Sequence, residues 1–253
     1  MRGFRLTSAI IVAGIGMTIA SSAVGAPRLV IPETEYNFGA VPQNAKVSHV
    51  FWLYSKGDDT LQILKVIPGC GCTQAPLEKT TLAPGDSTRL EVIFDTKHYT
   101  GKISKRPRVE SNEGPPEKYV QFNCEVMIRA DSTYPLIVKP YKLDISQFGQ
   151  QVRDRMKFTV TNASAEPLDI TLVSAPDILT VDCPKTVGAG ATVQGSIVLA
   201  ERALKTEFEK SITIEVNNAA HSRFTIPVKR ALRLPGDTTA NVNVSASGKV
   251  GGH

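Results

Sequence analysis

The chain has 253 residues, of which 42% are hydrophobic, 6% aromatic and 21% charged, and its formal net charge is +5. These fractions are close to those of soluble globular proteins, and they exclude a collagen-like, low-complexity or multi-pass membrane protein. At about 100–150 residues per domain, the length predicts two domains.

Residues 1–26 have the three regions of a secretory signal peptide. Arg2 and Arg5 supply positive charge, an apolar run follows from Ala9 to Ala20, and a stretch of small residues ends at Ala26. The apolar run is shorter than the roughly 20 residues that a membrane-spanning helix needs. An uncleaved membrane anchor is the alternative. We expect cleavage after Ala26 and an exported protein of the periplasm, the extracellular space or the cell surface, without a transmembrane segment.

Removal of this peptide leaves 27 basic and 24 acidic side chains and a net charge of +3. Nucleic-acid-binding proteins gather Lys and Arg on one face or stripe, whereas the longest basic run here is Lys105-Arg106-Pro107-Arg108. A solvated edge strand explains this run, because charges on a strand edge oppose aggregation between sheets. We therefore expect no nucleic-acid partner.

The rest of the chain alternates between apolar and polar residues. Leu90, Val92 and Phe94 alternate with charged side chains after a turn at Ala83-Pro84-Gly85-Asp86. A later run places Val120, Phe122, Cys124, Val126 and Ile128 on one face. Alternation with a period of two predicts β-strands that are buried on one side, so the expected class is all-β.

Four features of the sequence occur twice, about 105–110 residues apart. They are the dipeptides Phe38-Gly39 and Phe148-Gly149, the sets Phe51, Leu61, Ile63 and Phe158, Leu168, Ile170, the turns Pro84-Gly85 and Ala189-Gly190, and the segments ending in Asn112 and Asn217. Repetition in this order indicates two copies of one structural unit.

Each copy spans roughly 100 residues and about seven short strands, which is typical of an immunoglobulin-like β-sandwich. The sequence therefore predicts two tandem immunoglobulin-like β-sandwich domains, at residues 27–130 and 136–234, after the N-terminal signal peptide. The antibody pattern is missing because Trp52 precedes Cys70 instead of lying between two bridging cysteines. Residues 235–253 are rich in Gly, Ser, Thr and Asn and are expected to be a disordered tail.

The first copy carries three motifs that point to a family. They are Phe38-Gly39, the loop Cys70-Gly71-Cys72-Thr73, and the turn at Pro84-Gly85 that opens a strand. With these motifs, residues 34–128 resemble the bacterial domain-of-unknown-function family 1573. That family is similar to the immunoglobulin-like sandwiches of the major-sperm-protein, ASH and PapD-like modules. The resemblance implies a fold and export but no activity.

The second copy, residues 136–232, follows the family only in its pattern. Cys183 stands near the position of the signature loop, but the Cys-Gly-Cys-Thr sequence is absent there. In the first copy, Cys124 occupies a position of the last strand where family members usually have a small residue.

The four cysteines are expected to have different roles. Cys124 and Cys183 each share a strand face with apolar residues, so we interpret them as small buried hydrophobes. Cys70 and Cys72 lie in a glycine-flanked loop, and three roles are open for them. They can be structural, as part of the loop or in a disulfide, either with each other or from this loop to Cys124. They can also be a redox pair, or bind a soft metal such as Cu(I). We favour the structural role. No His or third thiol is close in sequence, so we assign no metal or cofactor.

The sequence contains none of the common catalytic motifs, such as a glycine-rich phosphate loop, His-Glu-x-x-His or Gly-x-Ser-x-Gly. We therefore predict no enzyme activity and no catalytic residues. The favoured function is a non-catalytic binding or scaffold protein with a protein partner, because such sandwiches present edge strands and loops to other chains. The alternatives are a thiol-redox or copper-handling protein that uses Cys70 and Cys72, and a PapD-like chaperone with Arg28 and Lys46 as candidate basic anchors.

Overall fold

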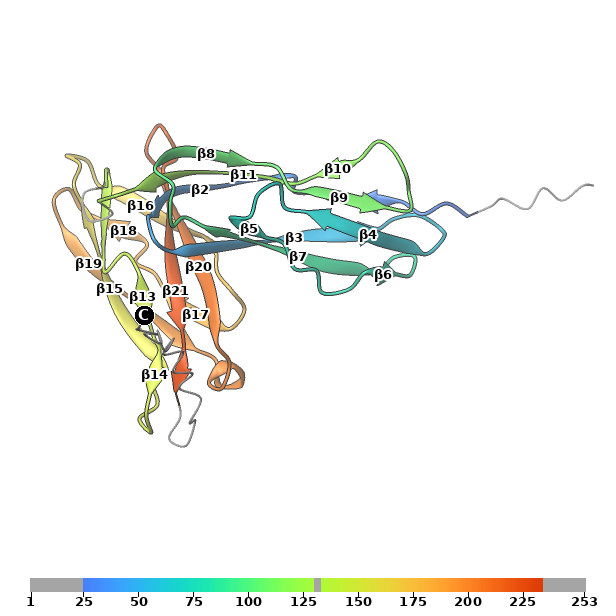
Figure 1. The fold of residues 1–253 in the computed structure, drawn as a ribbon. Coiled ribbons are helices and arrows are strands. Elements are labelled where there is room, and N and C mark those ends of the chain that lie inside the picture. The colour runs from blue at the N-terminus through green and yellow to red at the C-terminus, as the bar shows by residue number, and fades with distance from the viewer. Residues whose placement is uncertain (1–24, 130–132, 234–253) are drawn as a thin grey trace, which may run out of the picture.

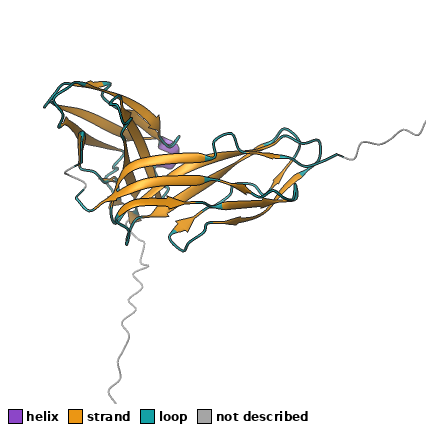
Figure 2. Cartoon of the chain, turned by 90° about the horizontal axis from the view of Figure 1, so that it is seen from above, coloured by secondary structure: helices purple, strands orange, loops and turns teal. Residues whose placement is uncertain are grey.

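The computed structural model describes residues 25–129 and 133–233. This part of the chain is built from β-strands, with one short 3₁₀ helix at Glu201–Ala203 (Figure 2). None of the described residues forms a helix that is long and apolar enough to cross a membrane. The proposed signal peptide up to residue 24, residues 130–132 at the domain boundary and the predicted disordered tail, residues 235–253, lie outside the described residues.

The first sandwich contains two layers of strands. One layer has the order β1-β3-β7-β5, and the other contains β10-β9-β4-β6 together with β8-β11-β2. Its strands are β1 (Leu29–Val30), β2 (Glu35–Pro42), β3 (Lys46–Ser55), β4 (Leu61–Ile67), β5 (Thr73–Gln74), β6 (Thr81–Leu82), β7 (Ser87–Asp95), β8 (Gly101–Lys105), β9 (Arg108–Ser111), β10 (Lys118–Tyr119) and β11 (Gln121–Met127).

The second sandwich has the same plan. Its layers are β12-β15-β19-β17 and β18-β16-β20-β21, with β13 paired to β21. Its strands are β12 (Leu136–Lys139), β13 (Leu143–Asp144), β14 (Gln147–Phe148), β15 (Arg155–Asn162), β16 (Leu168–Ser174), β17 (Leu179–Asp182), β18 (Thr186–Val187), β19 (Thr192–Leu199), β20 (Phe208–Val216), β21 (Arg223–Arg230) and β22 (Leu232–Arg233).

Each sandwich has its own hydrophobic core, as the alternating pattern predicts. Phe51, Phe94 and Phe122 are fully buried in the first core, and Phe158 and Phe224 are buried in the second. Burial of one such side chain contributes roughly 1.5–3 kcal/mol. The structure therefore confirms the all-β class and the two sandwiches.

The repeat extends to hydrogen bonds. In the first sandwich, Asn112 Oδ1 accepts a bond from the backbone nitrogen of Gln62 at 2.9 Å. In the second, Asn217 Oδ1 accepts one from Asp169 at the same distance. In each copy the asparagine follows one strand and binds the backbone of the strand paired with it, β4 in the first copy and β16 in the second. The correspondence between Asn112 and Asn217 is therefore confirmed.

The correspondence between Phe38-Gly39 and Phe148-Gly149 is wrong by three residues. The side chain of Asn37 accepts a bond from Gly39 N at 2.8 Å, and Asp144 accepts one from Ser146 N at 2.9 Å. Ile145 thus takes the buried position of Phe38, whereas Phe148 is 67% exposed. The two dipeptides are identical in sequence but occupy different structural positions, because backbone pairing with the last strand determines the register.

The two sandwiches meet at a steep angle, with the strands of one running across those of the other (Figure 1). Their sheets are joined at one point, where Ala40 of β2 pairs in parallel with Phe224 of β21. Through this pair, one sheet of the first sandwich is continuous with one sheet of the second.

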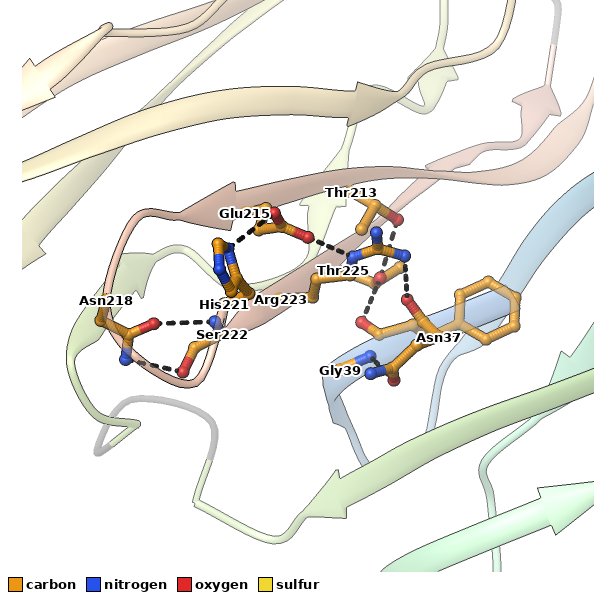
Figure 3. Close-up of polar contacts among 10 residues, drawn as sticks. Asn37, Gly39, Thr213, Glu215, Asn218, His221, Ser222, Arg223 and Thr225 are labelled. Carbon is orange, nitrogen blue, oxygen red and sulfur yellow. Dashed lines mark hydrogen bonds and ion pairs between the residues drawn. The ribbon is translucent and has the colours of Figure 1, made fainter. Parts of the chain in front are cut away.

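Side chains reinforce this junction. Thr225 Oγ1 donates a hydrogen bond to the carbonyl oxygen of Phe38 at 2.6 Å, and Arg223 reaches the carbonyl oxygen of Asn37 at 3.3 Å (Figure 3). Tyr141 donates to the carbonyl oxygen of Ala40 at 2.7 Å. Residues more than 100 positions apart in sequence are thereby held together.

Candidate functional site

The signature loop, residues 70–73, connects β4 to β5 of the first sandwich. A disulfide joins Cys70 to Cys72, with their Cα atoms 5.3 Å apart. Cys124 is free, so the alternative bridge between this loop and the last strand is not formed. Gly69, with φ of +84°, supplies the left-handed residue that turns the chain into the loop.

This disulfide does not tie the two layers together. It encloses only three residues, and in the chain-entropy model such a loop contributes about 1.6 kcal/mol to stability. A bridge between distant strands would contribute more, because the entropy of closing a loop grows with its length. Structural stabilisation alone is therefore a small gain from this pair of cysteines.

The two sulfur atoms have different surroundings. The hydroxyl of Tyr99 donates a hydrogen bond to Cys72 Sγ at 3.1 Å. Thr73 Oγ1 lies 3.3 Å from Cys70 Sγ and 3.7 Å from Cys72 Sγ. Lys105 Nζ lies 5.1 Å from the centre of the Tyr99 ring, within the range of a cation–π contact.

The loop is held more firmly at Cys72 than at Cys70. The carbonyl oxygen of Cys72 accepts a hydrogen bond from Asp95 N at 2.9 Å, and its side chain packs against the first core. The carbonyl oxygen of Cys70 accepts a long bond of 3.4 Å from Thr73 N. A Cβ atom added to Gly71 would meet nothing within 4 Å, so this side of the loop is open.

The other two cysteines differ from each other in burial. Cys124 is buried on β11, as expected, and burial raises the pKa of its thiol to about 12. Cys183 lies after β17 and is only partly buried; burial, followed by the charge of Asp182, raises its pKa to about 11. Both thiols are thus protonated and unreactive at neutral pH.

Cys183 does not occupy the position of the signature loop in the second sandwich. Ala200 N donates to the carbonyl oxygen of Ile178 at 2.9 Å, which repeats the bond between Asp95 and Cys72. Pro176 and Ile178 are therefore the structural counterparts of Cys70 and Cys72. The sequence comparison placed the loop a few residues too late.

No group of three or more His, Cys, Asp or Glu side chains in the described parts of the chain lies close enough together to hold a metal ion. His49 is engaged in the first sandwich, where its ring stacks on Tyr36 at 3.5 Å and its Nε2 atom lies 3.0 Å from a Glu33 carboxylate oxygen. Burial lowers the pKa of the His49 imidazole.

A cleft of about 670 Å³ lies where the two sandwiches meet. We call it the elbow cleft. Its walls come from β3 and β7 of the first sandwich and β20 of the second, which face the inner side of the bend in Figure 1. Its apolar lining consists of Val50, Trp52, Pro76, Leu77, Ala175, Pro176, Ile178 and Phe208. The loop around Pro176 and Ile178, which is the counterpart of the signature loop in the second sandwich, thus forms part of the wall.

Arg89 and Lys210, which line the elbow cleft, both pair with carboxylates. Arg89 lies 3.0 Å from a carboxylate oxygen of Glu78 and 3.9 Å from one of Asp177, which belongs to the other sandwich. Lys210 pairs with Glu91, again across the junction. Both basic side chains are therefore neutralised within the cleft, whereas Glu207, a further carboxylate of the lining, accepts a hydrogen bond from Leu232 N at 2.7 Å.

The two candidate basic anchors of a chaperone are not brought together in the elbow cleft. Lys46 pairs with Glu209 across the junction, and the Glu209 hydrogen bond raises the pKa of the lysine. The carbonyl oxygen of Arg28 accepts a hydrogen bond from Lys56 N, next to β1. Neither residue lines the cleft.

A second cleft of about 520 Å³ lies beside the hairpin that joins β20 to β21. Its lining includes Asn37, Asn123 and Arg223. Figure 3 shows Arg223 directed toward Glu215, with their side chains 2.6 Å apart, and His221 on the other side of the same carboxylate at 3.5 Å. Glu215 thus holds Arg223, the group of this set that crosses the junction, to the carbonyl oxygen of Asn37.

A model of a family described as "Protein of unknown function (DUF1573)" matches residues 29–126. This match confirms the family resemblance of the first sandwich. No curated protein matches the chain.

Among solved structures, the chain is similar to a protein of unknown function from Porphyromonas gingivalis W83, with 15% identity, coverage of 81% of this chain and 99% of that one, and a TM-score of 0.35. It is also similar to an ASH/PapD-like domain of human CEP192, with 9% identity, coverage of 47% and 98%, and a TM-score of 0.34. A C. elegans MSP family member, WR4, is 16% identical, with coverage of 40% and 100% and a TM-score of 0.28.

The elbow cleft was not predicted from the sequence. Trp52 and Phe208 lie on different repeats, and nothing in the alternating pattern indicates that they line one cleft. A signal was present in Trp52 itself: a large aromatic residue at an outward-facing strand position is 46% exposed. Aromatic side chains of this kind are common in binding surfaces.

Proposed function

We propose that this chain is an exported, non-catalytic binding or scaffold protein, and that the elbow cleft holds a segment of a protein partner. The observation that carries the proposal is the pairing of Trp52 with Arg89 across β3 and β7, at the wall of an apolar cleft. Trp and Arg are enriched among the residues that dominate protein–protein binding energy. The cleft is also within the size range of ordinary ligand sites.

The polar junction supports this proposal because it fixes both walls of the cleft. Ser48 N donates to Ser211 Oγ at 2.9 Å, and the same hydroxyl donates to the carbonyl oxygen of Ser48 at 2.8 Å. The pairs between Lys210 and Glu91 and between Lys46 and Glu209 lie beside this bond. A preformed site loses less conformational entropy when a partner binds.

Peptide selection tests the proposal directly. Trp52 is the single tryptophan of the chain, so its fluorescence reports on the elbow cleft alone. Peptides selected against the full mature chain from a random displayed library should change this fluorescence on binding. They should bind the Trp52→Ala variant more weakly by about tenfold or more, which is about 1.4 kcal/mol.

Leu64→Ala is the matched control. Leu64 is 63% exposed on β4, in the other layer of the same sandwich, and it does not line the elbow cleft. Affinity should be unchanged in this variant. Peptides whose affinity depends on Leu64 and not on Trp52 would disprove the proposed site.

Export is tested separately. The full chain produced in a bacterial host should be recovered from the periplasm or medium, with Pro27 as its first residue, whereas a chain that begins at Pro27 after an initiator methionine should remain in the cytoplasm. Recovery of the full chain in the cytoplasm with Met1 retained would contradict this part of the proposal.

A further inference from the structure

The disulfide of the signature loop has features that a purely structural bridge does not need. It is closed between near neighbours, it lies beside an open approach at Gly71, and one of its two sulfurs accepts a hydrogen bond from a tyrosine hydroxyl. We propose that the Cys70–Cys72 disulfide exchanges with thiols, and that Cys70 is the sulfur attacked while Cys72 is the leaving group.

The hydrogen bond from Tyr99 favours this direction, because at 3.1 Å from Cys72 Sγ it is shorter than the 3.3 Å contact between Thr73 Oγ1 and Cys70 Sγ. When a thiolate attacks one sulfur of a disulfide, negative charge develops on the other. Tyr99 Oη already lies 3.1 Å from Cys72 Sγ, so a donor is in place where that charge would appear. Hydrogen bonds to an ionised acceptor are roughly twice as strong as neutral ones. Tyr99 acts here as a positioning residue that stabilises the leaving thiolate.

The way the loop is held favours the same direction. Cys72 stays fixed, because its carbonyl oxygen is bound to Asp95 N and its side chain packs on the core. Cys70 lies between Gly69 and Gly71, and a Cβ atom added to Gly71 would meet nothing within 4 Å, so an incoming group has space beside the disulfide. Opening the bond can therefore move Cys70 while Cys72 remains beside Tyr99.

The exchange is a balanced two-electron reaction. A thiolate RS⁻ bonds to Cys70 Sγ, the Cys70–Cys72 bond breaks, and its electron pair goes to Cys72 Sγ, which takes up a proton. A second RS⁻ then attacks the R sulfur of the mixed disulfide and releases Cys70 as a thiolate, which is protonated in turn. The products are R–S–S–R and the reduced Cys70, Cys72 pair. The reductants are thiols, either small molecules or the cysteines of another protein.

Mapping of the mixed disulfide tests the direction of exchange. The oxidised mature chain is mixed with reduced glutathione, quenched with acid, alkylated and analysed by peptide mass spectrometry. The glutathione adduct is expected on Cys70, with the alkyl group on Cys72. An adduct mainly on Cys72, or no exchange under conditions that reduce a small cyclic disulfide, would overturn the proposal.

A second arm uses a reduced, unfolded polypeptide that contains cysteine pairs. Exchange at Cys70 with either probe supports the proposed chemistry, and the ratio of the two rates identifies the source of the thiols. These measurements do not involve Trp52, so their failure is distinguishable from a failure of the proposed binding function.

The role of Tyr99 is tested with Tyr99→Phe, which keeps the ring and removes the hydroxyl. The exchange should slow by about tenfold, as expected for the loss of one hydrogen bond to a charged group, and the preference for Cys70 over Cys72 should fall. Tyr119→Phe is the control, since the Tyr119 hydroxyl bonds to the exposed Glu117 at 2.8 Å and should have no effect. An unchanged preference in folded Tyr99→Phe would show that the hydroxyl does not direct the reaction.

Discussion

A Cβ atom on Gly39 would lie 2.1 Å from the carbonyl oxygen of Arg223, which belongs to the other sandwich. Gly39 also has φ of +65°, a conformation that other residues rarely adopt. The next residue, Ala40, makes the backbone pair with Phe224 that joins the two sheets. The glycine of the Phe-Gly motif thus allows the sandwiches to approach each other and form the elbow.

Replacement of Gly39 by alanine should destabilise the junction. Left-handed backbone costs roughly 1–2 kcal/mol for a residue with a side chain, and the overpacked contact with Arg223 adds roughly 1–3 kcal/mol. Gly85→Ala is the matched control, because Gly85 has φ of +84° but no atom within 4 Å of the added Cβ. Urea unfolding should show the larger loss for Gly39→Ala. Equal losses would mean that the close approach does not matter.

Replacement of Arg230 by methionine should lower the free energy of unfolding by about 3 kcal/mol, since buried acceptors would lose their donors. Arg230 is fully buried, and its guanidinium donates to the carbonyl oxygens of Ile145, Arg153 and Leu204. Arg155→Met is the comparison, because the Arg155 side chain is 73% exposed and should contribute little. Thermal unfolding of the two variants checks this, and a similar small effect for both would contradict it.

The stability of the chain should fall as the pH drops below about 6.5, through His49. Burial lowers the pKa of His49 in the folded protein. The unfolded chain therefore takes up a proton at a higher pH than the folded one, and stability that is present above the unfolded pKa decreases below it by up to about 1.4 kcal/mol per pH unit. Unfolding measured from about pH 7.5 to pH 5 should show a weaker pH dependence in His49→Gln. The exposed His98 provides the control, and equal effects of His98→Gln and His49→Gln would count against this origin.

Cys124 and Cys183 should resist alkylation in the folded protein. Burial raises their pKa values to about 12 and about 11, so almost no thiolate is present at about pH 8. Iodoacetamide should label neither residue before unfolding and both in urea, with the Cys70–Cys72 disulfide intact. Rapid labelling of Cys124 in the folded chain would show that β11 opens or that the thiol is reached from the second cleft.

Local patterns in the sequence predict most of the strands. The burial of β4 and β16 follows the same order, with Leu61 and Ile63 inward in one and Leu168 and Ile170 inward in the other, as the repeat indicated. The register at Phe148 failed because a matching dipeptide says nothing about which backbone atoms pair. The hydrogen bond between Asp144 and Ser146 repeats the one between Asn37 and Gly39, and it therefore shows that Ile145 corresponds to Phe38.

The elbow cleft depends on contacts that no local pattern encodes. Ser48 and Ser211 are 163 residues apart, and their reciprocal hydrogen bonds join one sandwich to the other. The disulfide was among the expected alternatives for Cys70 and Cys72, since Gly71 permits a tight bend. The Tyr99 hydrogen bond was not predicted, because it comes from a residue 27 positions away.

Position-specific cross-linking in the native host tests the proposed binding site most directly. A photoreactive amino acid is placed at Trp52 in one full-length chain and at Leu64 in another, and the cross-linked products are isolated and identified. A specific protein partner should be captured at position 52, with the cross-link mapped to one segment of that partner, and this product should be absent at position 64. Capture of the same partner at position 64 and not at position 52 would show that the elbow cleft is not where this protein binds.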